Sequence, residues 1–307
     1  MIIGVPKEIK LQEHRIGLTP ESVKILFNKG HEVLVENNGG FEAGFTNENY
    51  KNAGAKIINK AEEIFEKAEI IVKVKEPQIN EVKMIKENQI IFTYLHLAAA
   101  KELTEGLIKS KSICIAYETV TDDNGRLPLL APMSAVAGRM SIQAGAHSLE
   151  KNQKGRGLLL GGAPGVEPAN IVILGGGVVG ENAAIIATGM RGKVYVVDKS
   201  KERLKQLYKI FGEKIIPIQS DKTELSKLVS DCDLLIGGVL IPGAEAPKLV
   251  TKEMVKNMKR GSVVVDVAID QGGCVETSKP TTHANPTYLV DEVVHYCVAN
   301  MPGGVPR

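Results

Sequence analysis

The sequence predicts an α/β protein built from two doubly wound domains. Short runs of β-branched residues alternate with charged, amphipathic segments along the whole chain, and this alternation is typical of parallel sheets with helices on both faces. The chain has 307 residues, 43% of them hydrophobic, and that length favours two cores over one. A glycine-rich turn, Gly175 to Gly180, follows an apolar run, which indicates that the second domain is of the Rossmann type.

The first domain is expected over residues 1–128, where strands and helices alternate. Its first helix shows the signals: Thr19 can cap the helix, Pro20 suits its first turn and Gly30 can end it. The expected strands are 1–5, 31–36, 55–59, 69–77, 90–97 and 112–120. The expected helices are 19–30, 46–54, 60–68, a segment before Gln89, and 101–111.

The second domain is expected over residues 129–307, because turn residues between Asp122 and Pro132 interrupt the alternation. A long helix, 133–150, and a connection rich in glycine and proline, 154–170, precede the next strand. The expected strands are 171–175, 193–198, 214–219, 233–240 and 262–270. The expected helices are 181–190, 201–212, 223–232 and 251–261. These elements are enough for a second doubly wound sheet.

Gly175, Gly177 and Gly180 form a Gly-x-Gly-x-x-Gly motif between an apolar strand and a helix. In dinucleotide-binding folds the first glycine permits the turn, the second lets the main chain approach the pyrophosphate, and the third lets the helix pack on the strand. Asp198 ends the next strand, where a carboxylate would accept both ribose hydroxyls and repel the 2′-phosphate of NADP. The motif therefore predicts NAD as the cofactor.

The same residues also have plainer interpretations. A strand-to-helix turn followed by a capping aspartate needs no nucleotide. Lys199, Lys201 and Arg203 follow Asp198 closely and could accommodate a phosphate, although a solvated helical turn explains them more simply. Arg203 could instead lie along the adenine or the ribose.

Four polar residues are expected at the carboxyl ends of strands, where ligands bind in parallel sheets. Arg15 follows the first strand, Lys75 and His96 end two later ones, and Asp270 ends a strand of the second domain. Each alone has an ordinary explanation, such as a solvated cation. Together they are expected to converge on a cleft between the domains. Arginine and lysine can hold a carboxylate, and an imidazole can exchange a proton, so a small amino, keto or hydroxy acid is the expected substrate.

Composition excludes several other classes of protein. The net charge is +2, from 38 basic and 36 acidic residues, and without a basic block we expect no nucleic-acid partner. No apolar run reaches the roughly 18–20 residues of a membrane helix, nor is there the apolar core of a signal peptide, so we expect a cytoplasmic protein. The four cysteines lie far apart and are expected to be free thiols. No HExxH motif or Cys/His cluster predicts a metal.

Several longer motifs resemble the alanine dehydrogenase family. The segments that carry the resemblance are "GVPKEIKLQEHRIGLTPESV", "VKVKEP", "TYLHLAA", "APMSAVAGRMSIQAGAHSLEK", "VILGGGVVGENAA", "VVDVAIDQGGCVETSKPTTHANPTY" and "HYCVANMPGGVPR". They span essentially the whole chain and are more specific than the glycine motif alone. The resemblance implies reversible, NAD-dependent oxidative deamination of L-alanine to pyruvate and ammonia, by hydride transfer and addition of water to an iminium.

The resemblance also implies roles for individual residues. Arg15 and Lys75 would bind the substrate, and His96 and Asp270 would donate and accept protons. The residues implied at the NAD site are Ser134, Gly175, Gly177, Val178, Val179, Gly180, Asp198, Arg203, Ser220, Val239, Leu240, Val267, Ala268, Ile269, Asp270, Val298, Ala299, Asn300 and Met301. The division of the acid and base roles between His96 and Asp270 stays open.

The family usually continues past "MPGGVPR" with a C-terminal segment that returns to the first domain, whereas this sequence stops at Arg307. We therefore expect apolar surface on the first domain to be uncovered, and the family's usual hexamer to be weakened or replaced by a different homo-oligomer. Two alternatives remain: a nicotinamide nucleotide transhydrogenase subunit, with saccharopine-forming enzymes as more distant relatives, and a catalytically inactive NAD-binding regulator. Arg15, Lys75 and His96, together with the lack of a membrane segment, argue against the transhydrogenase subunit. The same three residues and Asp270 argue against the regulator, whereas the missing C-terminal segment argues for it.

Overall fold

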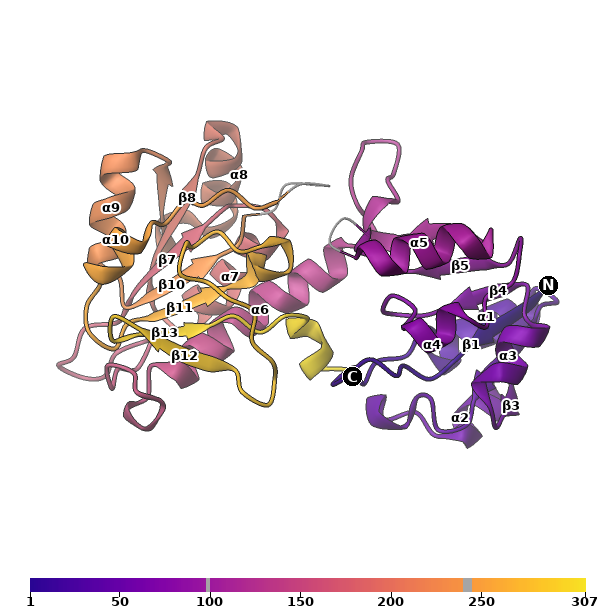
Figure 1. Cartoon of the computed structure of the whole chain (residues 1–307). Coiled ribbons are helices and arrows are strands. Elements are labelled where there is room, and N and C mark those ends of the chain that lie inside the picture. Colours follow the sequence, from indigo (N-terminus) through magenta and orange to yellow (C-terminus); the bar gives the residue numbers. More distant parts are fainter. Residues whose placement is uncertain (98–99, 240–244) are drawn as a thin grey trace. The chain divides into compact units, whose positions relative to one another are not determined.

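The computed structural model describes residues 1–97, 100–239 and 245–307, and the α/β fold class is confirmed (Figure 1). The chain divides into two compact units. The first unit comprises Met1–Leu130 together with Gly303–Arg307, and the second comprises Ala131–Pro302. The last five residues thus belong with the first unit. The expected division, with the boundary between residues 128 and 129, had placed them in the second domain.

The first unit contains a six-stranded sheet in the order β3-β2-β1-β4-β5-β6. Every neighbouring pair in it is parallel. Its strands are β1 (Ile2–Val5), β2 (Glu32–Glu36), β3 (Lys56–Ile58), β4 (Ile70–Val72), β5 (Ile90–Thr93) and β6 (Ile113–Ala116). Strands β1, β4 and β5 are consecutive in this order, so their carboxyl ends lie next to one another on the same side of the sheet.

Helices pack on both faces of this sheet. They are α1 (Pro20–Asn28), α2 (Asn47–Asn52), α3 (Ala61–Lys67), α4 (Ile79–Val82) and α5 (Lys101–Ser110). Leu34 packs in a core with α3 and α5, whereas its neighbours Val33 and Val35 pack with α1 and α2. This alternation follows from the two-residue period of a strand. Helix α1 begins as predicted, because the Thr19 side chain accepts a hydrogen bond from the Ser22 N–H.

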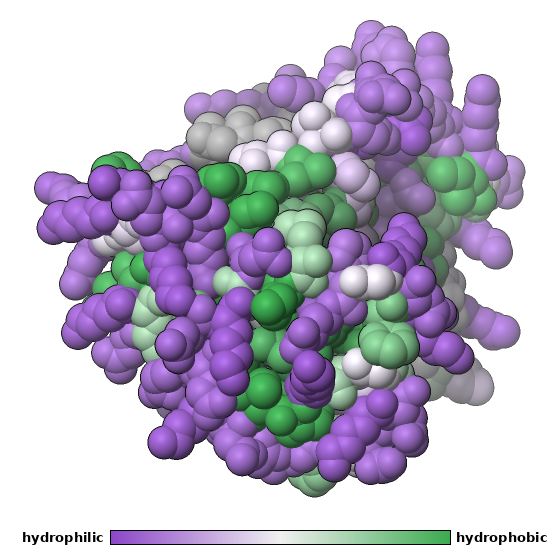
Figure 2. All heavy atoms as spheres, turned by 90° about the vertical axis from the view of Figure 1, so that its right-hand side faces the viewer, coloured by the Kyte–Doolittle hydropathy of each residue, from purple (hydrophilic) through white to green (hydrophobic). Residues whose placement is uncertain are grey.

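The first unit also exposes large apolar side chains. Figure 2, which shows the side of the molecule at the right of Figure 1, displays apolar residues gathered among polar ones. Ile25 and Phe27 of α1 are 54% and 51% exposed, and Ile113 and Ile115 of β6 are 49% and 40% exposed. Strand β6 forms one edge of the sheet, so these two isoleucines lie at its border.

The second unit contains a seven-stranded sheet in the order β12-β13-β11-β10-β7-β8-β9. Its strands are β7 (Asn170–Leu174), β8 (Lys193–Asp198), β9 (Ile215–Gln219), β10 (Leu234–Gly237), β11 (Val263–Asp266), β12 (Thr287–Val290) and β13 (Val293–Tyr296). Its helices are α6 (Ala131–Ser148), α7 (Val178–Gly189), α8 (Lys201–Phe211), α9 (Lys222–Asp231) and α10 (Lys252–Lys256). Helices α6, α7 and α8 pack on one face and α9 and α10 on the other.

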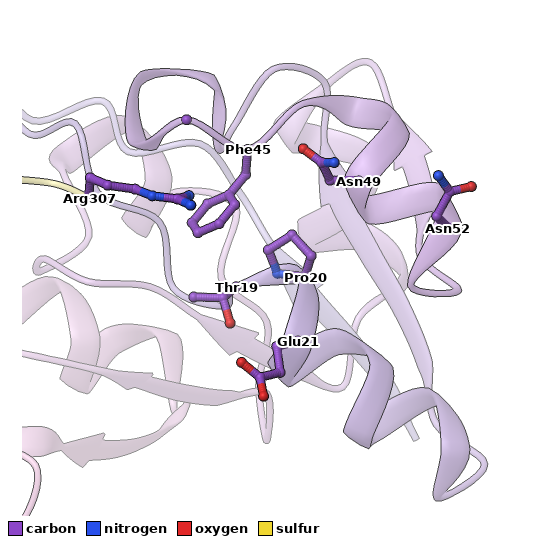
Figure 3. A pocket seen from close by; sticks show the side chains of 8 residues that line it. Thr19, Pro20, Glu21, Phe45, Asn49, Asn52 and Arg307 are labelled. Carbon is purple, nitrogen blue, oxygen red and sulfur yellow. The ribbon is translucent and has the colours of Figure 1, made fainter.

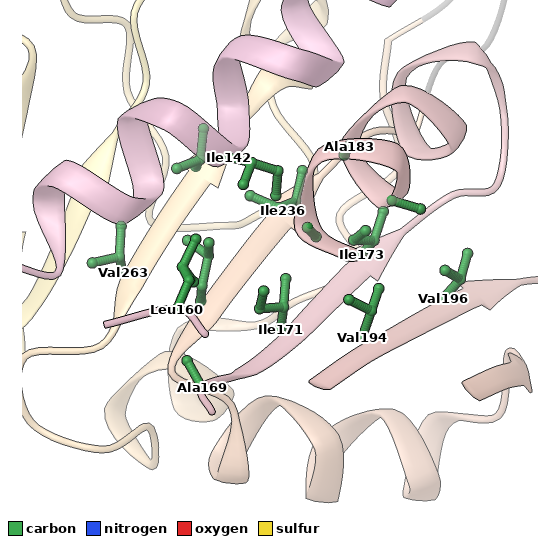
Figure 4. Close-up of a cluster of buried hydrophobic side chains, with 14 of the residues drawn as sticks. Ile142, Leu160, Ala169, Ile171, Ile173, Ala183, Val194, Val196, Ile236 and Val263 are labelled. Atoms are coloured by element: carbon green, nitrogen blue, oxygen red, sulfur yellow. The ribbon is translucent and has the colours of Figure 1, made fainter. Parts of the chain in front are cut away.

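Figure 4 shows the first of these two cores, in which Ile142 of α6 and Ala183 of α7 lie over Ile171 and Ile173 of β7. The hairpin of β12 and β13 is antiparallel and was not predicted. Among the described residues, no helix is long and apolar enough to cross a membrane.

Candidate active site

The glycine loop joins β7 to α7 in the second unit. Gly175 has a φ of 91°, which glycine adopts without strain. A Cβ atom on Gly180 would overlap the carbonyl oxygen of Gly175 and lie 3.3 Å from Ile173 Cγ2, so the third glycine is required for helix α7 to pack on β7. Both positions therefore need glycine for the fold itself.

Gly177 differs from these two glycines. Its φ is −67°, which any residue can adopt, and no heavy atom lies within 4 Å of a Cβ built on it. The fold therefore does not require glycine at this position. A ligand that must approach the main chain closely would require it, which fits the pyrophosphate of a dinucleotide at the start of a helix.

Asp198 ends β8 beside this loop. Its Oδ2 accepts a hydrogen bond of 2.7 Å from the Gly176 N–H, and its Oδ1 accepts one of 2.8 Å from the Ser200 N–H. Each carboxylate oxygen has a second lone pair, so the group can also accept ribose hydroxyls. Asp198 is not the N-cap of the following helix, which is Ser200; its carboxylate fixes the glycine loop instead.

Arg203 is tied to the same loop. Its Nε donates a 2.6 Å hydrogen bond to the Gly176 carbonyl oxygen, and its guanidinium group forms an ion pair with Glu181 in the first turn of α7. The predicted NAD residues Gly175, Gly177, Gly180, Asp198 and Arg203 are thus brought together. Glu181 was not predicted to belong to this site, although its position directly after Gly180 could have suggested it.

The other predicted NAD residues follow neighbouring strands of the second unit or lie near its helix starts. Ser220 follows β9, and its N–H donates to the Asp198 carbonyl oxygen over 2.9 Å. Val239 follows β10, Ser134 lies in the first turn of α6, and Val178 and Val179 begin α7. Leu240 lies outside the described residues. The segments Val267–Asp270 and Val298–Met301 meet where the Asn300 N–H donates to Asp270 Oδ1 over 3.2 Å.

Several of these side chains are buried in the apolar core: Val179, Ala268, Ile269, Val298 and Met301. They would face a ligand with their main chain rather than their side chains. Strand β11 ends at Asp266 and a 3-10 helix (Val267–Gln271) follows, so the strand expected up to Asp270 is shorter than predicted. Asp266 is the reason, because its carboxylate accepts N–H groups from Ala268, Cys274 and Val275.

In the first unit, Arg15 is held by a carboxylate. Its Nε and Nη2 donate hydrogen bonds of 2.7 and 2.6 Å to the two oxygens of Glu13. Glu13 is 5% exposed, and this two-point pairing fixes the plane of the guanidinium group. Glu13 was missed from the sequence, where only its position two residues before Arg15 could have suggested it.

His96 lies beyond the end of β5 and is held by Glu118. The N–H groups of Leu95 and His96 donate to Glu118 Oε1 over 3.1 and 2.7 Å, and His96 Nδ1 lies 3.3 Å from the same oxygen. Burial opposes the charge of Glu118, but the hydrogen bonds from His96 outweigh it and lower the pKa of Glu118 to about 2. The carboxylate turns Nδ1 toward itself, which makes Nε2 the atom suited to proton exchange.

Arg15, Lys75 and His96 follow β1, β4 and β5 along the chain, and the carboxyl ends of these three strands are neighbours in the first sheet. Tyr94 lies near two of them: its ring centroid is 6.0 Å from that of His96. Burial raises the pKa of Tyr94 to about 12, although the charge of Arg15 opposes this shift. Strands β4 and β5 end at Val72 and Thr93, earlier than predicted. The next N–H groups, those of Lys73 and Tyr94, still donate to the carbonyl oxygens of Phe92 and Val74. Beyond them, the carboxylates of Glu8 and Glu118 accept the N–H groups of Val74 and Leu95.

A pocket of the first unit lies elsewhere. It has a volume of about 740 Å³ and is lined by Thr19, Phe45, Asn49 and Arg307, among others. Figure 3 shows the Arg307 side chain reaching Phe45, with its guanidinium carbon 4.5 Å from the ring centroid. None of the predicted substrate residues lines this pocket, so we do not assign it to the candidate site.

Replacing Glu118 with glutamine should change how stability depends on pH. The pKa of Glu118 is depressed, so its contribution is complete above the unfolded value of 4.5 and is lost as the pH falls toward about 2. We expect the variant to be less stable by about 1–2 kcal/mol near neutral pH, allowing for partial exposure, and this difference to shrink below about pH 4. Urea unfolding across this pH range measures it. A difference independent of pH would contradict this role for the charge.

Two family models match this chain. The model "Alanine dehydrogenase/PNT, N-terminal domain" matches residues 4–137, and "Alanine dehydrogenase/PNT, C-terminal domain" matches residues 141–307. The chain belongs to the alanine dehydrogenase/PNT family. The resemblance seen in the sequence motifs is therefore confirmed.

Individual members of the alanine dehydrogenase/PNT family agree with this assignment. The alanine dehydrogenase of Halomonas elongata is 56% identical, and that of Methanococcus maripaludis is 54% identical; each match covers all of this chain and 83% of the relative. A solved L-alanine dehydrogenase has a TM-score of 0.96 and 53% identity over the whole chain, which covers 84% of that structure. A transhydrogenase from Sinorhizobium meliloti, with 24% identity and a TM-score of 0.87, shares the fold.

Proposed function

We propose that the chain is an NAD-dependent L-alanine dehydrogenase, which converts L-alanine and water to pyruvate and ammonia and catalyses the reverse reaction. The observation that carries the proposal is the group of Arg15, Lys75 and His96 beyond three adjacent strands, in a chain more than half identical to alanine dehydrogenases. A carboxylate clamp beside an imidazole suits an amino acid and its keto acid.

The residues of the chain have distinct roles in this reaction. Arg15, whose plane Glu13 fixes, donates hydrogen bonds to the substrate carboxylate, and Lys75 holds a further oxygen with its charge. His96 exchanges a proton at Nε2, and Asp270 orients or activates the water that adds to the iminium of the substrate.

The glycine loop and Asp198 are the residues that would hold NAD. Bound there, NAD supplies the acceptor for the hydride that leaves the α-carbon of alanine. The helix start at Gly177 would hold the pyrophosphate, and Asp198, whose Oδ2 accepts the Gly176 N–H, would accept the ribose hydroxyls and disfavour the extra phosphate of NADP. Val267–Asp270 and Val298–Met301 contribute main-chain groups.

Oxidation of NADH by the purified chain, supplied with pyruvate and ammonium, tests the proposal. We expect turnover that requires both reagents, and little when lactate replaces pyruvate or NADPH replaces NADH. Bound NADH without turnover would identify an inactive regulator instead, and hydride transfer to a second nucleotide would identify a transhydrogenase. A homo-oligomer and a cytoplasmic location stay predictions, of which sedimentation tests the first.

Replacing Gly177 with alanine separates the needs of the ligand from those of the fold. The added Cβ meets nothing in the protein, so we expect the free energy of unfolding to change by less than about 1 kcal/mol. The methyl group would occupy the space of the pyrophosphate, and we expect the Kd for NADH to rise by about tenfold or more. Fluorescence titration with NADH measures it. An unchanged Kd would show that the nucleotide does not approach this loop.

A further inference from the structure

The main chain of Lys75 is held on both sides by buried side chains. Its carbonyl oxygen accepts a 2.9 Å hydrogen bond from Thr93 Oγ1, and Thr93 is 0% exposed. Its N–H, together with that of Val74, donates to Glu8 Oε1, over 3.4 Å and 2.6 Å respectively. These side chains come from β5 and from the segment after β1. The main chain of Lys75, three residues beyond the end of β4, is therefore fixed by side chains that are far away in the sequence.

Glu8 is itself held by a buried lysine. Lys73 Nζ lies 3.1 Å from Glu8 Oε2 and 2.7 Å from Glu81 Oε1, and Lys73 is 0% exposed. Burial alone would lower the pKa of Lys73, but the two carboxylates raise it, so the lysine stays charged. The other oxygen of Glu81 accepts the Gln78 N–H over 2.7 Å at the start of α4. Four segments of the first unit thus converge on the residues around Lys75.

Stability alone does not account for this arrangement. Removing three charged groups from water is costly, and apolar side chains of similar size often make a core at least as stable as a buried ion pair. A buried charged cluster is better explained by the geometry that it imposes. Here that geometry is imposed on Val74 and Lys75, at the sheet edge that also carries Arg15 and His96.

We propose that Glu8 and Thr93 are positioning residues, which hold the main chain of Lys75 so that its ammonium group meets the substrate, and that Lys73 and Glu81 keep Glu8 in place. The inference rests on the proposed function, in which Lys75 binds the substrate. The Lys75 side chain is 5% exposed and its Nζ lies 3.7 Å from Glu76 Oε2, so the fixed main chain and this ion pair together limit the volume that the ammonium group can reach. Small displacements of such a group are costly, because binding depends on short contacts.

Thr93→Val tests the proposal, because valine keeps the shape of threonine and removes only the hydrogen bond to Lys75. We expect the KM for pyruvate to rise by about tenfold, with the KM for NADH unchanged. Ser262→Ala is the matched control: Ser262 is also buried and donates to a main-chain carbonyl, that of Cys232, over 3.1 Å in the second unit. Both variants should lose a similar few degrees of Tm. Equal KM values for pyruvate in the two variants would overturn the proposal.

Glu8→Gln provides a second test that does not depend on the reaction. Glutamine keeps an oxygen near Val74 and Lys75 but loses the charge that pairs with Lys73, whereas alanine would leave that lysine facing an empty space and endanger folding. We expect the amides of Val74 and Lys75 to exchange with solvent about tenfold faster than in the unchanged protein, by hydrogen exchange and mass spectrometry. If the unchanged protein oxidises no NADH, the proposed function fails, and this exchange still decides whether Glu8 holds Lys75. Unchanged exchange would show that it does not.

Discussion

Replacing His96 with alanine is expected to lower turnover with pyruvate, ammonium and NADH by about 10³-fold, because a positioned proton donor contributes roughly 10²–10⁴-fold. The Kd for NADH should stay within about twofold, since the glycine loop and Asp198 belong to the second unit, whereas His96 belongs to the first. Steady-state rates give the first quantity and fluorescence titration the second. A protein that only senses NAD would have no turnover to lose, and its Kd for NADH would also stay unchanged.

His96 has a φ of 50°, so a second variant is needed to separate chemistry from strain. Alanine is strained at such a φ, whereas asparagine tolerates it better. His96→Asn should therefore lose as much turnover as His96→Ala and retain more of its stability. If His96→Asn kept more than about a tenth of the turnover, Asp270 or another group would have to perform the proton transfer.

Replacing Gly180 with alanine is expected to destabilise the second unit and to weaken NADH binding. The new Cβ would overlap the carbonyl oxygen of Gly175 and lie 2.9 Å from its carbonyl carbon, so α7 must move away from β7. We expect a loss of about 3 kcal/mol in the free energy of unfolding. We also expect an increase of about 10²-fold in the Kd for NADH, because the helix start no longer faces the ligand.

Gly189 supplies the matched control, since it ends the same helix and a Cβ there meets nothing within 4 Å. Gly189→Ala should leave the Kd for NADH unchanged and should leave stability equal or higher by a few tenths of a kcal/mol, because alanine restricts the unfolded chain. Urea unfolding and NADH titration of the two variants make the comparison. Equal behaviour would contradict the close packing of α7 on β7.

The sequence was sufficient for the features whose physical requirements are local. The glycine loop could be predicted because Gly175, Gly177 and Gly180 lie within six residues and each meets a separate need. Asp198 could be placed because it directly ends β8. Likewise, Thr19 and Pro20 predicted the start of α1, because a helix cap depends only on its neighbours.

The groups that hold the candidate catalytic residues could not be predicted. Glu118 is 22 residues from His96, and Glu8 is 67 residues from Lys75, and no local pattern links them. Their carboxylates accept the N–H groups of Leu95 and Val74, which lie beyond the ends of β5 and β4. The β12–β13 hairpin (Thr287–Val290 and Val293–Tyr296) was not predicted; it is antiparallel and departs from the strand–helix alternation of the rest of the chain.

The carboxylates at these strand ends bear on how the family's motifs could be used in engineering. A segment such as "TYLHL" is short enough to be transferred alone, but its conformation depends on Glu118. The conformation of "VKVKEP" likewise depends on Glu8 and Thr93. Grafted alone onto another parallel sheet, either segment would lack the acceptors or donors that shape it. The transferable module is therefore the strand end together with its distant partner, and a designer would have to carry over both.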